Sequence, residues 1–136
     1  MSEQNKAIVQ QAYNNFKTGN IDALLGLMAD EVSWTLPDMA GVPFGGKRSG
    51  RSAVGEFFSL IGGSQDSLRF EPTRLIAEGD MVVALGSSDW RVKANKREFG
   101  GDFAHVFKIR DGKIVEFNEY MDTAACSNAH QKAMSA

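Results

Sequence analysis

Apolar and polar residues follow two different periods along this chain, helical near its start and strand-like over most of its second half. Between Glu3 and Lys17, apolar residues recur every three to four positions, which predicts an amphipathic helix. Gly19 is a typical residue just after a helix, and Asn20 is a typical N-cap for the next one. A second helix is therefore expected over residues 21–29.

A short strand and a loop separate this helix from a third. Residues 32–36 alternate with period two and stop before a proline, which predicts a strand. Residues 38–50 hold four glycines and a further proline, so we expect a loop there. A third helix is expected through residues 54–61, with Ser49 or Ser52 as its N-cap.

The remaining pattern is mostly that of strands. Four strands are predicted, over residues 68–77, 81–92, 98–109 and 113–121. Asp122 follows them as a candidate N-cap for a polar C-terminal helix. Helices followed by successive strands are typical of the α+β class. We expect residues 1–136 to form a single domain, in which a long curved antiparallel sheet wraps around the three N-terminal helices and leaves a cavity.

The last predicted hairpin decides which polar side chains reach the interior. A two-residue loop would pair Arg110 with Lys113 and turn His105 and Glu119 to opposite faces. A three-residue loop would pair Ile109 with Lys113 instead. We favour this second register, because it gathers the larger apolar residues. It places the following side chains on one face: His105, Phe107, Phe117, Glu119 and Met121.

Composition and charge narrow the function. The chain is 43% hydrophobic and 24% charged, with a formal net charge of −2 and no basic stripe, which argues against nucleic-acid binding. No apolar run approaches the roughly 20 residues of a membrane span, and no signal-peptide core is visible. Cys126 is the only cysteine. We therefore expect a cytoplasmic protein that contacts neither membrane nor nucleic acid.

Three segments together carry a family resemblance. They are the helix junction KTGNID (residues 17–22), LMADEVSWTLP (27–37) and RDGKIVEFNEYMD (110–122). With these motifs the chain resembles the nuclear-transport-factor-2-like superfamily, which has a cystatin-like cone-shaped fold and includes ketosteroid isomerase and the SnoaL-like polyketide cyclases. The resemblance implies a small-molecule cavity and a homodimer formed through the outer face of the sheet, to which Val83 and Tyr120 would contribute.

Only some catalytic residues of the related enzymes have a chemically equivalent counterpart in this chain. The ketosteroid isomerase base falls on Leu36, its oxyanion tyrosine on Ala12 beside Tyr13, and its protonated aspartate on His105. The standard isomerase residues are therefore not retained. SnoaL-like cyclases use an acidic residue on a late strand as acid/base, and Glu119 is the equivalent here. Of the limonene-epoxide-hydrolase arrangement, only the carboxylate at Glu119 remains.

His105 and Glu119 are thus the predicted catalytic residues. Parity and resemblance add a set of pocket residues, although the facing of Trp90 is left open: Tyr13, Trp34, Leu36, Phe57, Trp90, Phe107, Phe117 and Met121. The expected function is a cofactor-independent acid/base enzyme of isomerase, lyase, cyclase or hydrolase type, acting on an apolar carbonyl or cyclic metabolite. The alternative is a non-catalytic ligand-binding or accessory domain.

Two further motifs do not change this interpretation. Residues 41–48 resemble a phosphate-binding loop, but they lack its final Ser/Thr and its strand–loop–helix context. Cys126 and His130 have the spacing of two neighbouring helix positions, yet two ligands do not make a zinc site. That part of the helix is expected to be exposed. No metal or cofactor is predicted.

Overall fold

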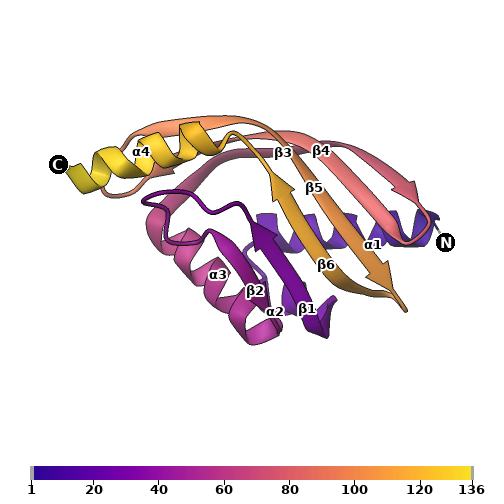
Figure 1. Ribbon diagram of the computed structural model, residues 1–136. Coiled ribbons are helices and arrows are strands. Elements are labelled where there is room, and N and C mark those ends of the chain that lie inside the picture. Colours follow the sequence, from indigo (N-terminus) through magenta and orange to yellow (C-terminus); the bar gives the residue numbers. More distant parts are fainter. Residues whose placement is uncertain (1, 136) are drawn as a thin grey trace.

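The computed structural model describes residues 2–135 and contains one six-stranded sheet with helices packed against it (Figure 1). The helices are α1 (Ser2–Lys17), α2 (Ile21–Gly26), α3 (Arg51–Ser64) and α4 (Thr123–Ser135). The strands are β1 (Met28–Leu36), β2 (Gly46–Ser49), β3 (Gln65–Glu78), β4 (Met81–Val92), β5 (Glu98–Arg110) and β6 (Lys113–Tyr120). The predicted α+β class is confirmed.

The sheet is mixed and not purely antiparallel. Its strand order is β2-β1-β6-β5-β4-β3, and β1 runs parallel to β6 while every other pair is antiparallel. The prediction of an antiparallel sheet was therefore wrong for one pair of strands, β1 and β6. No hairpin links β1 to β6, because nearly the whole domain separates them in sequence, so no turn imposes an antiparallel direction.

The three N-terminal helices cover the inner face of the curved sheet, as predicted. Figure 1 shows α1, α2 and α3 beneath the sheet and α4 at one end of it. The α1 helix buries Val9, Ala12 and Tyr13 against the sheet, and α3 buries Val54, Phe57 and Phe58. Between them these helices form one continuous apolar core with the inward-facing residues of β1, β4, β5 and β6. None of the helices in residues 2–135 has the length and apolarity to cross a bilayer.

Several element boundaries differ from the prediction. The second helix ends at Gly26, because Met28 already pairs with Ile114 as the start of β1. The predicted loop contains the short edge strand β2, whose polar sequence gives no alternating signal. The third helix begins after Gly50 without a side-chain cap, so neither Ser49 nor Ser52 has the predicted role. Asp122 does cap α4, since its carboxylate accepts a hydrogen bond from the Ala125 amide at 2.9 Å.

The β5–β6 hairpin turns through two residues. Asp111 and Gly112 both have positive φ values, 53° and 76°, as a type I′ turn requires. Arg110 therefore pairs with Lys113, and the favoured three-residue loop was wrong.

A bulge in β6 nevertheless produces the predicted face. Ile109 pairs with Ile114, but Lys108 pairs with Glu116, so Val115 is an extra residue on its strand. Beyond this point His105 lies directly opposite Glu119. Both side chains consequently point to the same side of the sheet.

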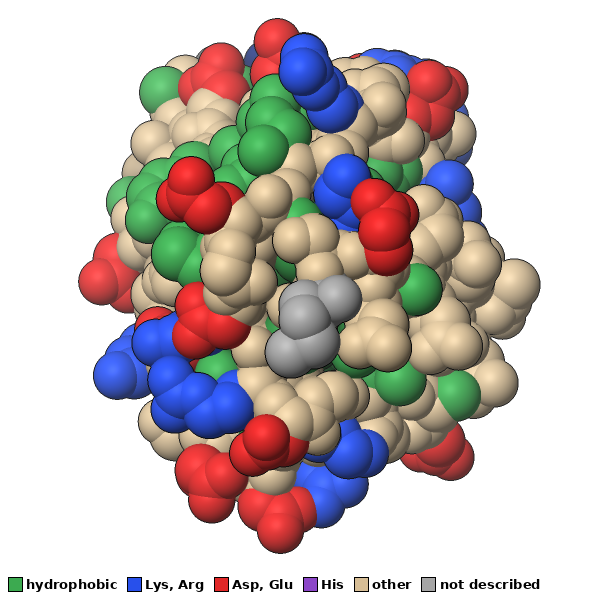
Figure 2. Space-filling view, turned by 90° about the vertical axis from the view of Figure 1, so that its right-hand side faces the viewer, with side chains coloured by type: hydrophobic (Ala, Val, Ile, Leu, Met, Phe, Trp, Pro, Cys, Tyr) green, Lys and Arg blue, Asp and Glu red, His purple; other side chains and the backbone are tan. Residues whose placement is uncertain are grey.

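The outer face of the sheet carries an apolar patch. Cross-strand pairing aligns its members in two neighbouring rows over β3, β4, β5 and β6. This outer apolar patch consists of Ile76, Val83, Leu85, Ala104, Val106 and Tyr120. Figure 2 shows one side of the molecule, where hydrophobic side chains gather in a band at the upper left and charges of both signs are interspersed elsewhere.

Candidate functional site

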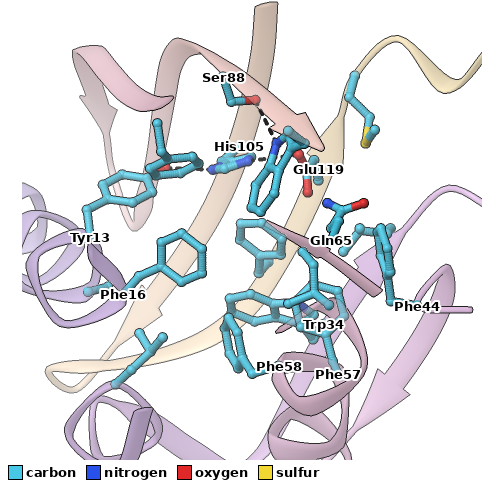
Figure 3. Close-up of a pocket in the computed structure, with 18 of the residues that line it drawn as sticks. Tyr13, Phe16, Trp34, Phe44, Phe57, Phe58, Gln65, Ser88, His105 and Glu119 are labelled. Carbon is cyan, nitrogen blue, oxygen red and sulfur yellow. Dashed lines mark hydrogen bonds and ion pairs between the residues drawn. The ribbon is translucent and has the colours of Figure 1, made fainter. Parts of the chain in front are cut away.

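A small cavity lies between the inner face of the sheet and the helices (Figure 3). Its volume is about 70 Å³, and most of its lining is aromatic. All ten residues selected from the sequence line it, including Trp90, whose facing the sequence left open. The lining also contains residues that the sequence did not single out, among them Phe16, Phe44, Phe58, Gln65, Phe70, Ser88 and Phe99.

His105 and Glu119 form a polar pair in this cavity. The Nε2 atom of His105 lies 3.2 Å from Oε2 of Glu119, and the two side chains are 6% and 19% exposed. The ring nitrogen is not aligned on that oxygen as a hydrogen bond requires, so the contact is electrostatic. Nε2 therefore keeps its hydrogen-bonding capacity for another group.

Tyr13 reaches the same imidazole from the other side. Its hydroxyl is hydrogen bonded to Nδ1 of His105 at 2.7 Å, and its ring is buried in the core. Burial, and secondarily the negative charge of Glu119, raises the pKa of Tyr13 well above its usual range. The phenol consequently stays protonated at neutral pH. Figure 3 shows Tyr13, His105 and Glu119 in a line across the cavity.

Ring stacking supports several side chains around the cavity. The Phe103 ring stacks on His105 with a centroid distance of 4.2 Å, and Trp34 stacks on Phe117 at 3.9 Å. Trp90 donates its indole N–H to the hydroxyl of Ser88 at 3.1 Å. These contacts fix the orientation of the side chains before any ligand binds.

The α4 helix contacts Gln65, one of the residues that line the cavity. The Nε2–H group of His130 donates to the side-chain carbonyl of Gln65 at 2.8 Å, and both side chains are buried. Burial lowers the pKa of His130, so its ring is neutral at neutral pH. Gln65 was missed because it sits at a helix–strand junction, where neither hydrophobic period applies.

The expectation that Cys126 and His130 are exposed was wrong, because both lie inside the interface of α4. Burial, and then the charge of Glu119, raises the pKa of the Cys126 thiol to about 12. A protonated thiol is a poor metal ligand and a poor nucleophile. Within residues 2–135, no third His, Cys, Asp or Glu completes a metal cluster with this pair.

Comparisons with known proteins agree on the fold. A family model described as a SnoaL-like domain matches residues 9–117. An NTF2-like protein from Burkholderia xenovorans LB400 is 25% identical, with a TM-score of 0.87 over 96% of this chain and 98% of its own. An NTF2-like protein from Burkholderia pseudomallei K96243 is 28% identical, with a TM-score of 0.85 over 95% of this chain and 98% of its own.

A third similar structure contains an organic molecule. TerC, co-crystallized with polyporic acid, is 26% identical to this chain, with a TM-score of 0.80 over 94% of this chain and 98% of its own. A search of curated proteins finds no match to the sequence. The geometry and the similar structures together describe a small-molecule pocket in a nuclear-transport-factor-2-like fold.

Proposed function

This chain belongs to the SnoaL-like family, and from that premise we propose that its cavity is the active site of a cofactor-independent acid/base enzyme. The substrate is an apolar carbonyl-bearing or cyclic metabolite. The reaction is an isomerisation, cyclisation or hydrolysis that begins with a proton transfer. The observation that carries this proposal is the line of Tyr13, His105 and Glu119 inside an otherwise aromatic cavity.

The hydrogen bond from Tyr13 selects a tautomer of His105. In this proposal the imidazole is neutral, and the Tyr13 O–H donates to its Nδ1 atom. The ring proton then resides on Nε2, beside the carboxylate of Glu119. The site thus offers one proton acceptor and one N–H donor to the same small volume.

These two groups suit proton abstraction next to a carbonyl. Glu119 takes a proton from the carbon beside the carbonyl group, and the electron pair moves onto the carbonyl oxygen. The Nε2–H group of His105 stabilises the resulting negative charge. If the substrate has a carbon–carbon double bond next to the deprotonated carbon, that bond shifts toward the carbonyl group as Glu119 returns the proton to its far end, which completes an isomerisation without an external electron donor. The same carboxylate activates water or a carbon nucleophile in the other two reaction types.

The cavity size limits the substrate. A single water needs roughly 10–15 Å³ of such volume, so about 70 Å³ accommodates a fragment of about one ring. The aromatic walls favour flat, apolar ligands. The co-crystal of TerC with polyporic acid supports the use of such a fold to bind an organic ligand.

The test is the substitution Glu119→Gln. The amide has nearly the same shape but cannot exchange a proton at neutral pH, so turnover of an identified substrate should fall roughly 10²–10⁴-fold. Glu116→Gln is the matched control, because Glu116 lies on the same strand and pairs with Lys108 on the outer face. Turnover that Glu119→Gln leaves unchanged would remove Glu119 from the mechanism.

The alternative remains a non-catalytic ligand-binding or accessory domain. The small volume of the cavity and the near-complete burial of His105 favour it, because such a pair can simply stabilise the sheet. A screen of apolar ketones, epoxides and lactones separates the two functions. Binding without turnover in this screen supports the alternative.

A further inference from the structure

The two tryptophans of the cavity differ in one respect. The Trp90 indole N–H is satisfied by Ser88 at 3.1 Å. The Trp34 indole N–H is buried and has no hydrogen-bond partner among the residues whose side chains the structure describes. A buried donor without a partner is uncommon in proteins and costs stability, so its retention calls for an explanation.

The surroundings of Trp34 offer no acceptor of their own. Its indole is 5% exposed and packs between Phe117, Phe57 and Phe58, with centroid distances of 3.9, 5.8 and 5.5 Å. These rings hold the indole in one orientation and give its N–H at most a weak contact with an aromatic face. The donor is thus rigid and desolvated, which is the state in which a hydrogen bond to a ligand is strongest.

Trp34 and His105 both contact the ring of Phe117. The Phe117 centroid is 3.9 Å from that of Trp34 and 4.9 Å from that of His105. Like the indole, the Nε2 atom of His105 has no aligned hydrogen-bond partner in the described part of the chain. The same cavity is therefore lined by two residues whose ring nitrogens have no aligned hydrogen-bond partner.

We propose that the ligand carries two acceptor oxygens on one apolar frame, and that the indole N–H of Trp34 binds the second of them. The first oxygen lies at His105 and Glu119. The substrate class is then a dicarbonyl compound, a keto-ester or a similar pair of oxygens, and not a simple monoketone. This inference rests on the proposed use of the cavity as a ligand site, but it does not require turnover.

The indole N–H signals of the ¹⁵N-labelled protein test this directly. The chain has two tryptophans, so two indole signals are expected, and Trp90→Phe assigns them. The probe is cyclohexane-1,4-dione, and the control is 4-methylenecyclohexanone, which replaces one carbonyl oxygen with a CH₂ group. The dione should move the Trp34 signal downfield and leave the Trp90 signal, already bonded to Ser88, nearly unchanged.

Affinities from the same titrations add a second measurement. The dione should bind about fivefold more tightly than 4-methylenecyclohexanone, the effect of one added hydrogen bond. Trp34→Phe should remove this preference, because the phenyl ring has no N–H group to bind the second oxygen. A Trp34 signal that the dione does not move, whether the dione binds elsewhere or not at all, would overturn the inference.

The outcome is distinguishable from failure of the proposed enzyme. A protein that binds the dione through Trp34 but turns over no substrate would retain this inference and lose the catalytic proposal. A protein whose turnover depends on Glu119 but whose Trp34 signal never moves would show the reverse.

Discussion

A single hydroxyl group binds one of the two ring nitrogens of the imidazole in the cavity. The Tyr13 hydroxyl, 2.7 Å from Nδ1 of His105, occupies the nitrogen that faces the helix layer. The other nitrogen then faces Glu119. Removal of this hydroxyl would leave a buried ring nitrogen without a partner.

Tyr13→Phe should therefore lower the free energy of unfolding by about 1–3 kcal/mol, measured by urea denaturation. The chain provides a matched control in its second tyrosine, Tyr120, which is 59% exposed on the outer face. Tyr120→Phe should stay within about 0.5 kcal/mol of the wild type. Equal effects of the two substitutions would show that the buried hydrogen bond contributes no stability of its own.

Some of these residues could be located from the sequence and others could not. Alternation indicated that His105 and Phe107 share one face of β5 and that Phe117 and Glu119 share one face of β6. That the two faces coincide was predicted from a three-residue loop, whereas in the structure a two-residue turn and a bulge produce it. The bond between Tyr13 and His105 joins residues 92 positions apart on a helix and a strand. Such a contact depends on how the two elements pack, which no local period encodes.

At the next scale, α4 is held to the rest of the domain by separate polar contacts. Ser127 donates to the carbonyl of Ala40 at 2.7 Å, and Asn95 donates to the carbonyl of Ala129 at 3.0 Å. His130 donates to Gln65 inside the interface. Because Gln65 lines the cavity, the position of α4 affects the cavity wall directly.

This helix should make stability depend on pH. Burial lowers the pKa of His130 below its usual 6.5, so the unfolded chain binds this proton more readily than the folded chain. The contribution of neutral His130 is complete above about pH 6.5 and is lost as the pH falls toward the lower folded-state pKa.

In denaturation between about pH 7 and pH 5, the wild type should lose more stability than His130→Gln. The glutamine amide still donates to Gln65 but takes up no proton in this range. A stability difference between the two proteins that stays constant with pH would contradict the assignment.

The order of elements was predictable because each long element has a clear period, but their pairing was less so. The run from Leu24 to Met28 fits a helix or a strand, and the structure divides it: Leu24 lies in α2, whereas Met28 begins β1 by pairing with Ile114. The short strand β2 exists only because β1 offers an edge, so its own sequence of Gly, Lys, Arg and Ser carries no signal.

For the whole molecule, the outer apolar patch is the surface most suited to self-association. Its members occupy adjacent rows on four strands, and a contiguous apolar surface of this kind commonly marks an interface. We propose that two copies of the chain pair through it as a homodimer.

Sedimentation should show a dimer at micromolar concentration, and Leu85→Glu should convert it to a monomer by placing a charge in the interface. Leu60→Glu is the matched control, since Leu60 lies on α3 and is 38% exposed, against 37% for Leu85. The control should remain dimeric. A wild type that sediments only as a monomer would exclude this interface.

The extra residue Val115 reverses the alternation of inward-facing and outward-facing positions within one strand. Ile114, on the turn side, faces the core, and so do Phe117 and Glu119 on the far side. Because Ile114 and Phe117 are an odd number of positions apart, no uninterrupted alternation could bring both inside. Loss of Val115 alone would leave every pairing of the hairpin as it is. The length of this hairpin can therefore change at that position without moving the carboxylate out of the cavity.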